Sequence, residues 1–217
     1  MHGIFYDPQH DEIVVPVALG GAILTLPGGA NGGDQPLRVI QGPKTQLVQP
    51  DTLYVDLPHD EIVADSGDDS VLIFPRTASG DVAPIRRIGG PKTGLNWPMA
   101  IDVDIARNEI AVANNGDSSI RIFRRTAAGD VAPLRVIKGA RTGVTGPMGV
   151  AFDRKNNEIW VANYGDHTAL VFPNTAAGNV APKRTVRNAP AGSPTVGFGN
   201  PGAVAYDSKR DEILVPN

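Results

Sequence analysis

The chain has 217 residues, 41% of them apolar, and a formal net charge of −3 from 20 basic and 23 acidic side chains. This length and apolar content suffice for a substantial core, and the nearly balanced charge creates no broad field that would attract nucleic acid or an anionic membrane. Cysteine is absent, which excludes disulfides, thiolate metal sites and thiol nucleophiles.

One uncharged stretch, residues 13–33, has the length of a membrane span but is interrupted by Pro16, Gly20, Gly21 and Pro27. Such residues break a helix, so we expect no membrane span. The first 15 residues lack a basic region followed by an apolar one, so no signal peptide is present in this stretch. The localisation stays open, with a secreted or periplasmic protein as one alternative.

A repeat of about 49 residues organises the chain. A proline stands six residues before an aspartate in four units, and Met1 stands six before Asp7 in the first. An acidic residue followed by isoleucine recurs a few positions later. The aspartates are Asp7, Asp56, Asp104, Asp153 and Asp207, and the glutamates are Glu12, Glu61, Glu109, Glu158 and Glu212. The repeats therefore predict one domain with units 1–49, 50–97, 98–146, 147–200 and an incomplete 201–217.

The second half of the unit recurs as VLIFPRTASGDVAPIRRIGGPKTGL from Val71, and closely similar segments begin at Ile120 and Leu170. The first unit is divergent. It lacks the Thr-Ala and Val-Ala pairs but keeps Pro36, Arg38 and the following Gly-Pro-Lys-Thr.

Each unit predicts four short strands, as residues 147–187 illustrate. We expect strands at 149–152, 158–162, 168–172 and 183–186, separated by polar turns, with no helix of three turns. Four antiparallel strands repeated radially are typical of a β-propeller, so we predict an all-β propeller-type array of about 4.3 blades, part of a larger propeller. The predicted core comprises Ile62, Ile73, Ile101, Ile110, Ile122, Val150, Ile159 and Val171.

The segment VADSGDDSVLIF, residues 63–74, resembles the second strand, turn and third strand of NHL-repeat propellers. Residues 112–123 and 161–172 repeat it with asparagine in place of the first aspartate. The resemblance covers essentially the whole chain and implies the propeller fold. It does not imply one function, because this architecture hosts scaffolds, lyases and lactonases alike.

The position after the second strand is polar in every unit except the first, which has Val17, and it supplies the candidate ligand-binding residues Asp65, Asn114, Asn163 and Asn217. Propellers similar to gluconolactonase hold Ca²⁺ with such side chains near a central channel, but a hard cation needs six or more oxygen ligands, several of them carboxylates. We therefore expect turn-forming roles in which each side chain bonds its own backbone two residues on. No cofactor is expected, with Ca²⁺ as the alternative.

The repeated aspartates and glutamates are expected to close turns and make a repeated polar contact, because a catalytic pair needs two different environments. His10 and His59 occupy equivalent turn positions and are expected to be exposed, and His167 stands singly beside Asp166. The basic residues of the third and fourth strands, including Arg76, Arg86, Arg125 and Arg135, are expected on a solvated outer face. No catalytic residue is predicted.

These observations favour a non-enzymatic scaffold or binding protein that presents propeller loops to a protein or ligand. The alternative is a channel-centred lactonase or lyase that uses a divalent metal. The expected partner is a protein, or a second copy bound through open blade edges, with no nucleic acid involved. Because the last unit supplies only two strands, we expect the polypeptide to continue toward a ring, or a neighbouring copy to cover the edge in a head-to-tail assembly.

Overall fold

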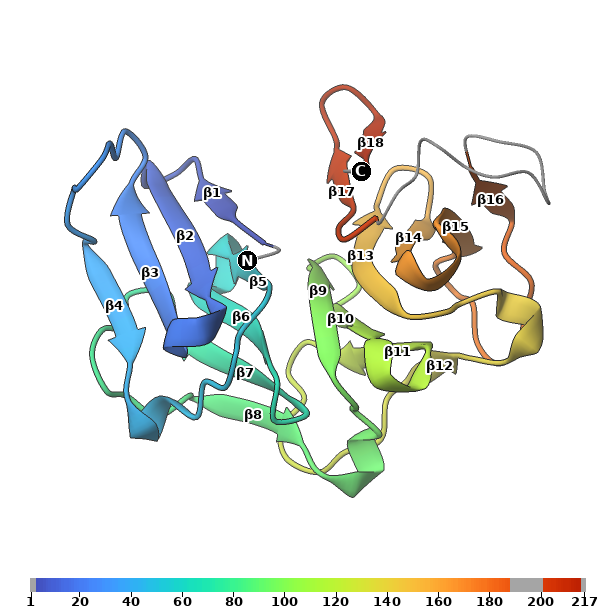
Figure 1. Cartoon of the computed structure of the whole chain (residues 1–217), viewed down its shortest axis with the longest axis horizontal. Helices are drawn as coiled ribbons and strands as arrows, with labels where there is room; N and C mark the ends of the chain where they lie inside the picture. The colour runs from blue at the N-terminus through green and yellow to red at the C-terminus, as the bar shows by residue number, and fades with distance from the viewer. Residues whose placement is uncertain (1–2, 188–200, 216–217) are drawn as a thin grey trace. The chain divides into compact units, whose positions relative to one another are not determined.

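The computed structural model describes residues 3–187 and 201–215, and these residues form antiparallel β-sheets. Helical residues within the described ranges are confined to single 3-10 turns, as the sequence predicts. Four of the sheets have four strands each and are called blades 1 to 4, and a fifth, two-stranded sheet follows (Figure 1). The all-β array of four-stranded antiparallel units is thereby confirmed.

Within each blade the strands pair in chain order. Blade 1 contains β1 (Phe5–Asp7), β2 (Glu12–Val17), β3 (Ala22–Pro27) and β4 (Arg38–Gln41), and blade 2 contains β5 (Leu53–Asp56), β6 (Glu61–Ser66), β7 (Ser70–Pro75) and β8 (Arg86–Gly89). Blade 3 contains β9 (Pro98–Asp104), β10 (Glu109–Asn114), β11 (Ser119–Arg124) and β12 (Arg135–Ile137). Blade 4 contains β13 (Pro147–Asp153), β14 (Glu158–Asn163), β15 (Thr168–Pro173) and β16 (Arg184–Val186), and the fifth unit contains β17 (Ala205–Asp207) and β18 (Glu212–Leu214).

Strand positions follow from local pattern. The predicted strands of residues 147–187 are each found within about two residues of the observed bounds. The second and third strands of blades 2 to 4 are short apolar runs buried on both faces, such as β6, in which every residue is buried. Their register is regular, with Ile62 opposite both Val55 and Phe74.

The chain divides into two compact parts, residues 1–98 with 127–131, and residues 99–126 with 132–217. In the first part, Val14 and Ile23 of blade 1 share a core cluster with Ile62, Leu72 and Phe74 of blade 2. In the second part, Ile120 and Ile122 of blade 3 pack with Ile159 and Phe172 of blade 4. All eight predicted core residues are buried, which confirms that part of the prediction. We call the face of a blade that packs on the preceding blade its rear face, and the opposite face its front face. In blade 1 the rear face is the one that carries the residues at the same repeat positions.

A loop of the following blade covers the edge of the fourth strand. The loop residues Gly80, Gly129 and Gly178 form parallel bridges with Ile40, Ile88 and Ile137. The side chain after each of these glycines, such as Asp81, accepts a backbone N–H from the turn that follows the fourth strand. This loop bonds some of the backbone N–H and C=O groups of the fourth strand, whose edge would otherwise be open to pairing with other chains.

Candidate functional site

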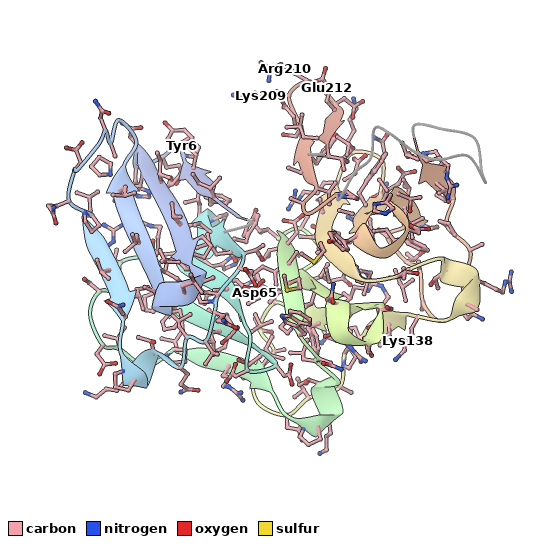
Figure 2. The ribbon with its side chains drawn as sticks, viewed as in Figure 1. Tyr6, Asp65, Lys138, Lys209, Arg210 and Glu212 are labelled. Carbon is pink, nitrogen blue, oxygen red and sulfur yellow. The ribbon has the colours of Figure 1, made fainter. Side chains whose placement is uncertain are left out.

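Asp65 is fully buried in β6 and ties the entry of one strand to the end of the next (Figure 2). Its Oδ1 accepts the N–H groups of Asp51 at 2.7 Å and Thr52 at 3.0 Å, and its Oδ2 accepts the Thr52 hydroxyl at 2.9 Å. The expectation that this side chain bonds its own backbone two residues on was wrong. Thirteen residues separate Asp65 from Thr52, and the pairing of β5 with β6 brings them together.

Asn163 makes the same kind of link in blade 4. Its Oδ1 accepts the Thr145 N–H at 2.7 Å, and its Nδ2 donates to the Gly143 carbonyl at 2.9 Å. Asn114 is also fully buried, and its Nδ2 donates to Asp117 at 2.5 Å. Asn217, the fourth candidate, lies outside the described residues.

The three described candidates are thus held within their own blades by loop entry and turn contacts. No group of three or more histidine, cysteine, aspartate or glutamate side chains in residues 3–187 and 201–215 has an arrangement that could hold a metal ion. Burial raises the pKa of Asp65 to about 7, although the hydrogen bonds from Thr52 and Asp51 act in the opposite direction. An asparagine accepts a backbone N–H without this cost, which explains why blade 4 can use Asn163 at this position.

The aspartate that ends each first strand closes the hairpin turn. Asp7 Oδ1 accepts the Gln9 and His10 N–H groups, and Asp153 Oδ1 accepts that of Asn156. The residue three positions after the aspartate also bonds the carboxylate through its side chain. These side chains are His10, His59, Arg107, Asn156 and Arg210.

His10 and His59 are exposed, as predicted, and each also contacts the turn aspartate of its own blade. His10 Nδ1 lies 2.7 Å from Asp7 Oδ2, and His59 Nδ1 lies 2.8 Å from Asp56 Oδ1. Because arginine and asparagine occupy the same position in other blades, the histidines act here as turn-closing side chains. The third, His167, adopts a left-handed backbone at the end of a 3-10 turn, beside the ring of Tyr164.

In blades 1 to 4 the glutamate that begins the second strand binds an arginine of the fourth strand, across the intervening third strand. Glu61 and Arg86 form two parallel bonds of 2.7 and 2.8 Å, a bidentate geometry that suits guanidinium and carboxylate. The equivalent pairs are Glu12–Arg38, Glu109–Arg135 and Glu158–Arg184.

The predicted solvated outer face is accordingly wrong for Arg86 and Arg135, which are partly buried ion-pair partners, whereas Arg184 is exposed. Arg76 and Arg125 are each only 8% exposed. Arg76 donates to Glu12 of the preceding blade and to Asp60 of its own blade. The sequence contains both the basic and the acidic residues, but it did not indicate which of them form ion pairs.

Two equivalent polar recesses lie between the turn after the second strand and the loop after the fourth. The blade 2 recess has a volume of about 310 Å³, and the blade 3 recess about 270 Å³. Each contains an aspartate and a cation from the fourth-strand region, Asp68 with Arg87 at 3.1 Å and Asp117 with Lys138 at 2.8 Å. Lys138 is labelled in Figure 2. Burial opposes ionisation of Asp117, but hydrogen bonds outweigh it and lower its pKa to about 2. The donors are Lys138, Ser119, Asn114 and Arg121.

Asp102 is a non-repeated acidic residue that the sequence analysis missed. Its Oδ2 accepts the N–H of Phe152, on the first strand of the next blade, at 2.7 Å. Its Oδ1 lies 3.3 Å from the Arg154 guanidinium. Burial raises its pKa, with Arg154 acting in the opposite direction. Aligning the first strands by position would have found it, because the equivalent residues are aromatic or alanine: Phe5, Tyr54, Ala151 and Ala205.

No family model matches the sequence, and no curated protein matches it significantly. Among the described residues there is no helix with the length and hydropathy needed to cross a bilayer.

Proposed function

We propose that the protein is a non-enzymatic scaffold or binding protein of the NHL-like propeller kind, which presents the loops of successive blades to a protein or ligand. The observation that carries this proposal is the repeated polar recess. Blades 2 and 3 place Asp68 and Asp117 at equivalent positions, each next to a cation from the fourth-strand region, so each compact part offers a similar polar recess beside the same loop.

The contacts that the other carboxylates make support the same proposal. The repeated aspartates close turns and four of the repeated glutamates bind arginines of their own blades. A metal-dependent lactonase or lyase would need oxygen ligands directed at a common centre. The oxygens of Asp65 and Asn163 instead accept bonds from the loops that enter their blades.

The test combines a binding screen with an activity assay. The immobilised protein is screened by interferometry against defined acidic, basic and neutral peptides and against neutral and anionic oligosaccharides. We expect at least one class to bind, and binding to fall about tenfold when both recesses are altered by Asp68→Asn, Arg87→Met, Asp117→Asn and Lys138→Met. Asp34→Asn, a charge removed from an exposed loop of blade 1, is the matched control and leaves binding unchanged.

The same preparations are assayed for hydrolysis of δ-lactones and aryl esters with added Ca²⁺ or Zn²⁺. Turnover that depends on either metal and disappears on chelation would overturn the proposal. So would a screen in which no probe binds, or one in which binding survives alteration of both recesses.

A further inference from the structure

Each later blade carries residues that reach back to the blade before it. In the first compact part, Arg76 of blade 2 donates to Glu12 of blade 1 at 3.0 Å. The Asp81 carboxylate lies over Gly42 and accepts the Lys44 N–H at 2.7 Å. Asp130 over Gly90 and Asn179 over Gly139 repeat the second contact. These residues bind the front of one blade to the rear of the next.

Blade 1 lacks this set. Gly28 and Gly33 stand at the positions of Arg76 and Asp81. Its rear face is nevertheless accessible at Tyr6, which is 55% exposed, whereas its counterparts Val55, Val103 and Phe152 are fully buried. A partner of this rear face therefore binds it without contacts from residues equivalent to Arg76 and Asp81, which blade 1 lacks.

The fifth unit, which also has a tyrosine at this position, shows how such a face contacts the blade before it. Its Tyr206 hydroxyl donates to Asp211 at 2.9 Å, and the same Asp211 binds Lys155 of blade 4 at 2.5 Å. This tyrosine–aspartate pair receives a lysine from the first turn of the preceding blade. Hydrogen bonding to Lys155 lowers the pKa of Asp211, consistent with a bound cation.

Blade 1 carries the same pair at the same positions. Tyr6, labelled in Figure 2, donates to Asp11 at 2.9 Å, and both residues are exposed. The other blades have valine or phenylalanine in place of this tyrosine. Within residues 3–187 and 201–215, no cation is bonded to Asp11 as Lys155 is to Asp211.

The complementary cation is Lys209, which occupies the position of Lys155 in the fifth unit (Figure 2). The open end of the same hairpin, away from this turn, is apolar. Leu214 is 55% exposed, and with Ala203, Val204, Ala205 and Val215 it lines a recess of about 410 Å³. The chain therefore displays a lysine in the turn of a hairpin whose open end is apolar, and an exposed tyrosine–aspartate pair on blade 1.

We propose that the rear face of blade 1 binds the front face of the fifth unit of a second copy, with Lys209 of one copy bound to the Tyr6–Asp11 pair of the other. The inference adds a partner to the scaffold function proposed above and rests on it. It follows from charge complementarity and from continuity with the packing already seen between blade 4 and the fifth unit. The contact is heterologous, so its repetition extends an assembly head to tail.

Sedimentation velocity over a range of concentrations tests this directly. We expect the unaltered protein to associate reversibly, and association to weaken as salt is raised. Asp11→Lys and Lys209→Glu are each expected to weaken it about tenfold. The double variant Asp11→Lys/Lys209→Glu, and an equimolar mixture of the two single variants, should both recover association because the pair is restored with exchanged charges. Asp34→Lys and Lys44→Glu are matched controls that change the same charges elsewhere on blade 1, and they should have no effect.

A crosslinking experiment identifies which copy supplies the lysine. Because the chain has no cysteine, Gln9→Cys and Ser208→Cys introduce unique thiols in the same two exposed turns and leave Asp11 and Lys209 in place. A short bismaleimide should join the two single variants into a dimer. A monomeric unaltered protein, a double variant crosslinked only within one chain, or loss of association in Asp11→Lys alone with no rescue by exchange would overturn the proposal. The peptide and oligosaccharide screen concerns blades 2 and 3, so either proposal can fail while the other stands.

Discussion

The carboxylate of Asp81 occupies the space that a side chain on Gly42 would need, because a Cβ built on Gly42 would lie 2.6 Å from the carboxyl carbon. The φ of Gly42 is +130°, a conformation that favours glycine. The close approach lets Asp81 accept the Lys44 N–H at 2.7 Å. This contact recurs wherever one blade reaches back to another through its long loop.

We expect Gly42→Ala to lower the free energy of unfolding by about 2 to 3 kcal/mol, because it adds both backbone strain and a steric clash. Asp81→Ala should cost about 1 kcal/mol for the lost hydrogen bond. Asp81→Asn should be nearly neutral, since Asn179 makes the same bond to the Arg141 N–H. Urea unfolding followed by tryptophan fluorescence measures all three, and an Asp81→Asn variant as unstable as Asp81→Ala would contradict this account.

The Asp65 carboxyl predicts a pH-dependent stability. Its folded pKa of about 7 lies above the ordinary value of 3.8, so the folded protein holds a proton that the unfolded chain has released between these values. The contribution to stability is therefore fully present below pH 3.8, falls as the pH rises toward 7, and stays low above it.

We expect Asp65→Asn to remove this dependence, so that the variant gains stability relative to the unaltered protein as the pH is raised from 4 to 8. Asn163→Asp, the reverse change at the equivalent position, should introduce a similar loss at high pH. Urea midpoints at pH 4, 5, 6, 7 and 8 measure both. A difference between Asp65→Asn and the unaltered protein that is constant with pH would show that Asp65 keeps an ordinary pKa.

Replacing the glutamate of a glutamate–arginine pair should lower the free energy of unfolding, whereas replacing the equivalent glutamate of the fifth unit should not. Glu61→Ala should lower the free energy of unfolding by about 2 kcal/mol, because Arg86 loses two charge-assisted hydrogen bonds and stays partly buried. Glu212→Ala changes the equivalent residue in the fifth unit, where Glu212 is exposed. That control should change stability by less than about 0.5 kcal/mol. Equal losses at the two positions would show that the pair contributes little to blade 2.

Thr93 is fully buried, and we expect its hydroxyl to stabilise the loop after β8 through hydrogen bonds. Its Oγ1 donates to the Gly90 carbonyl at 2.6 Å and accepts the Leu95 N–H at 3.2 Å, which fixes the loop after β8. Thr93→Val keeps the shape but removes both bonds, and should cost about 1 to 2 kcal/mol. Thr93→Ser keeps the oxygen and should cost less. Thermal unfolding by circular dichroism compares them, and a valine variant no less stable than the serine variant would refute the role.

The strands, the turns and most of the core could be predicted from the sequence because they depend on local patterns. Residues 158–163 are an apolar run between two polar turns, and such a run specifies a strand wherever it lies. The five-fold recurrence of the opening then indicated one architecture rather than several. The buried positions Ile62 and Ile159 followed from their place in that repeat.

The partners of the polar residues could not be predicted in this way. Asp65 with Thr52, Glu61 with Arg86, and Asp102 with Phe152 are separated by 13, 25 and 50 residues. These contacts depend on strand register and on which faces of neighbouring blades pack together. A sequence pattern records a residue type at a position but not the group that pairing and packing bring opposite it, and for these residues the group opposite determines the role.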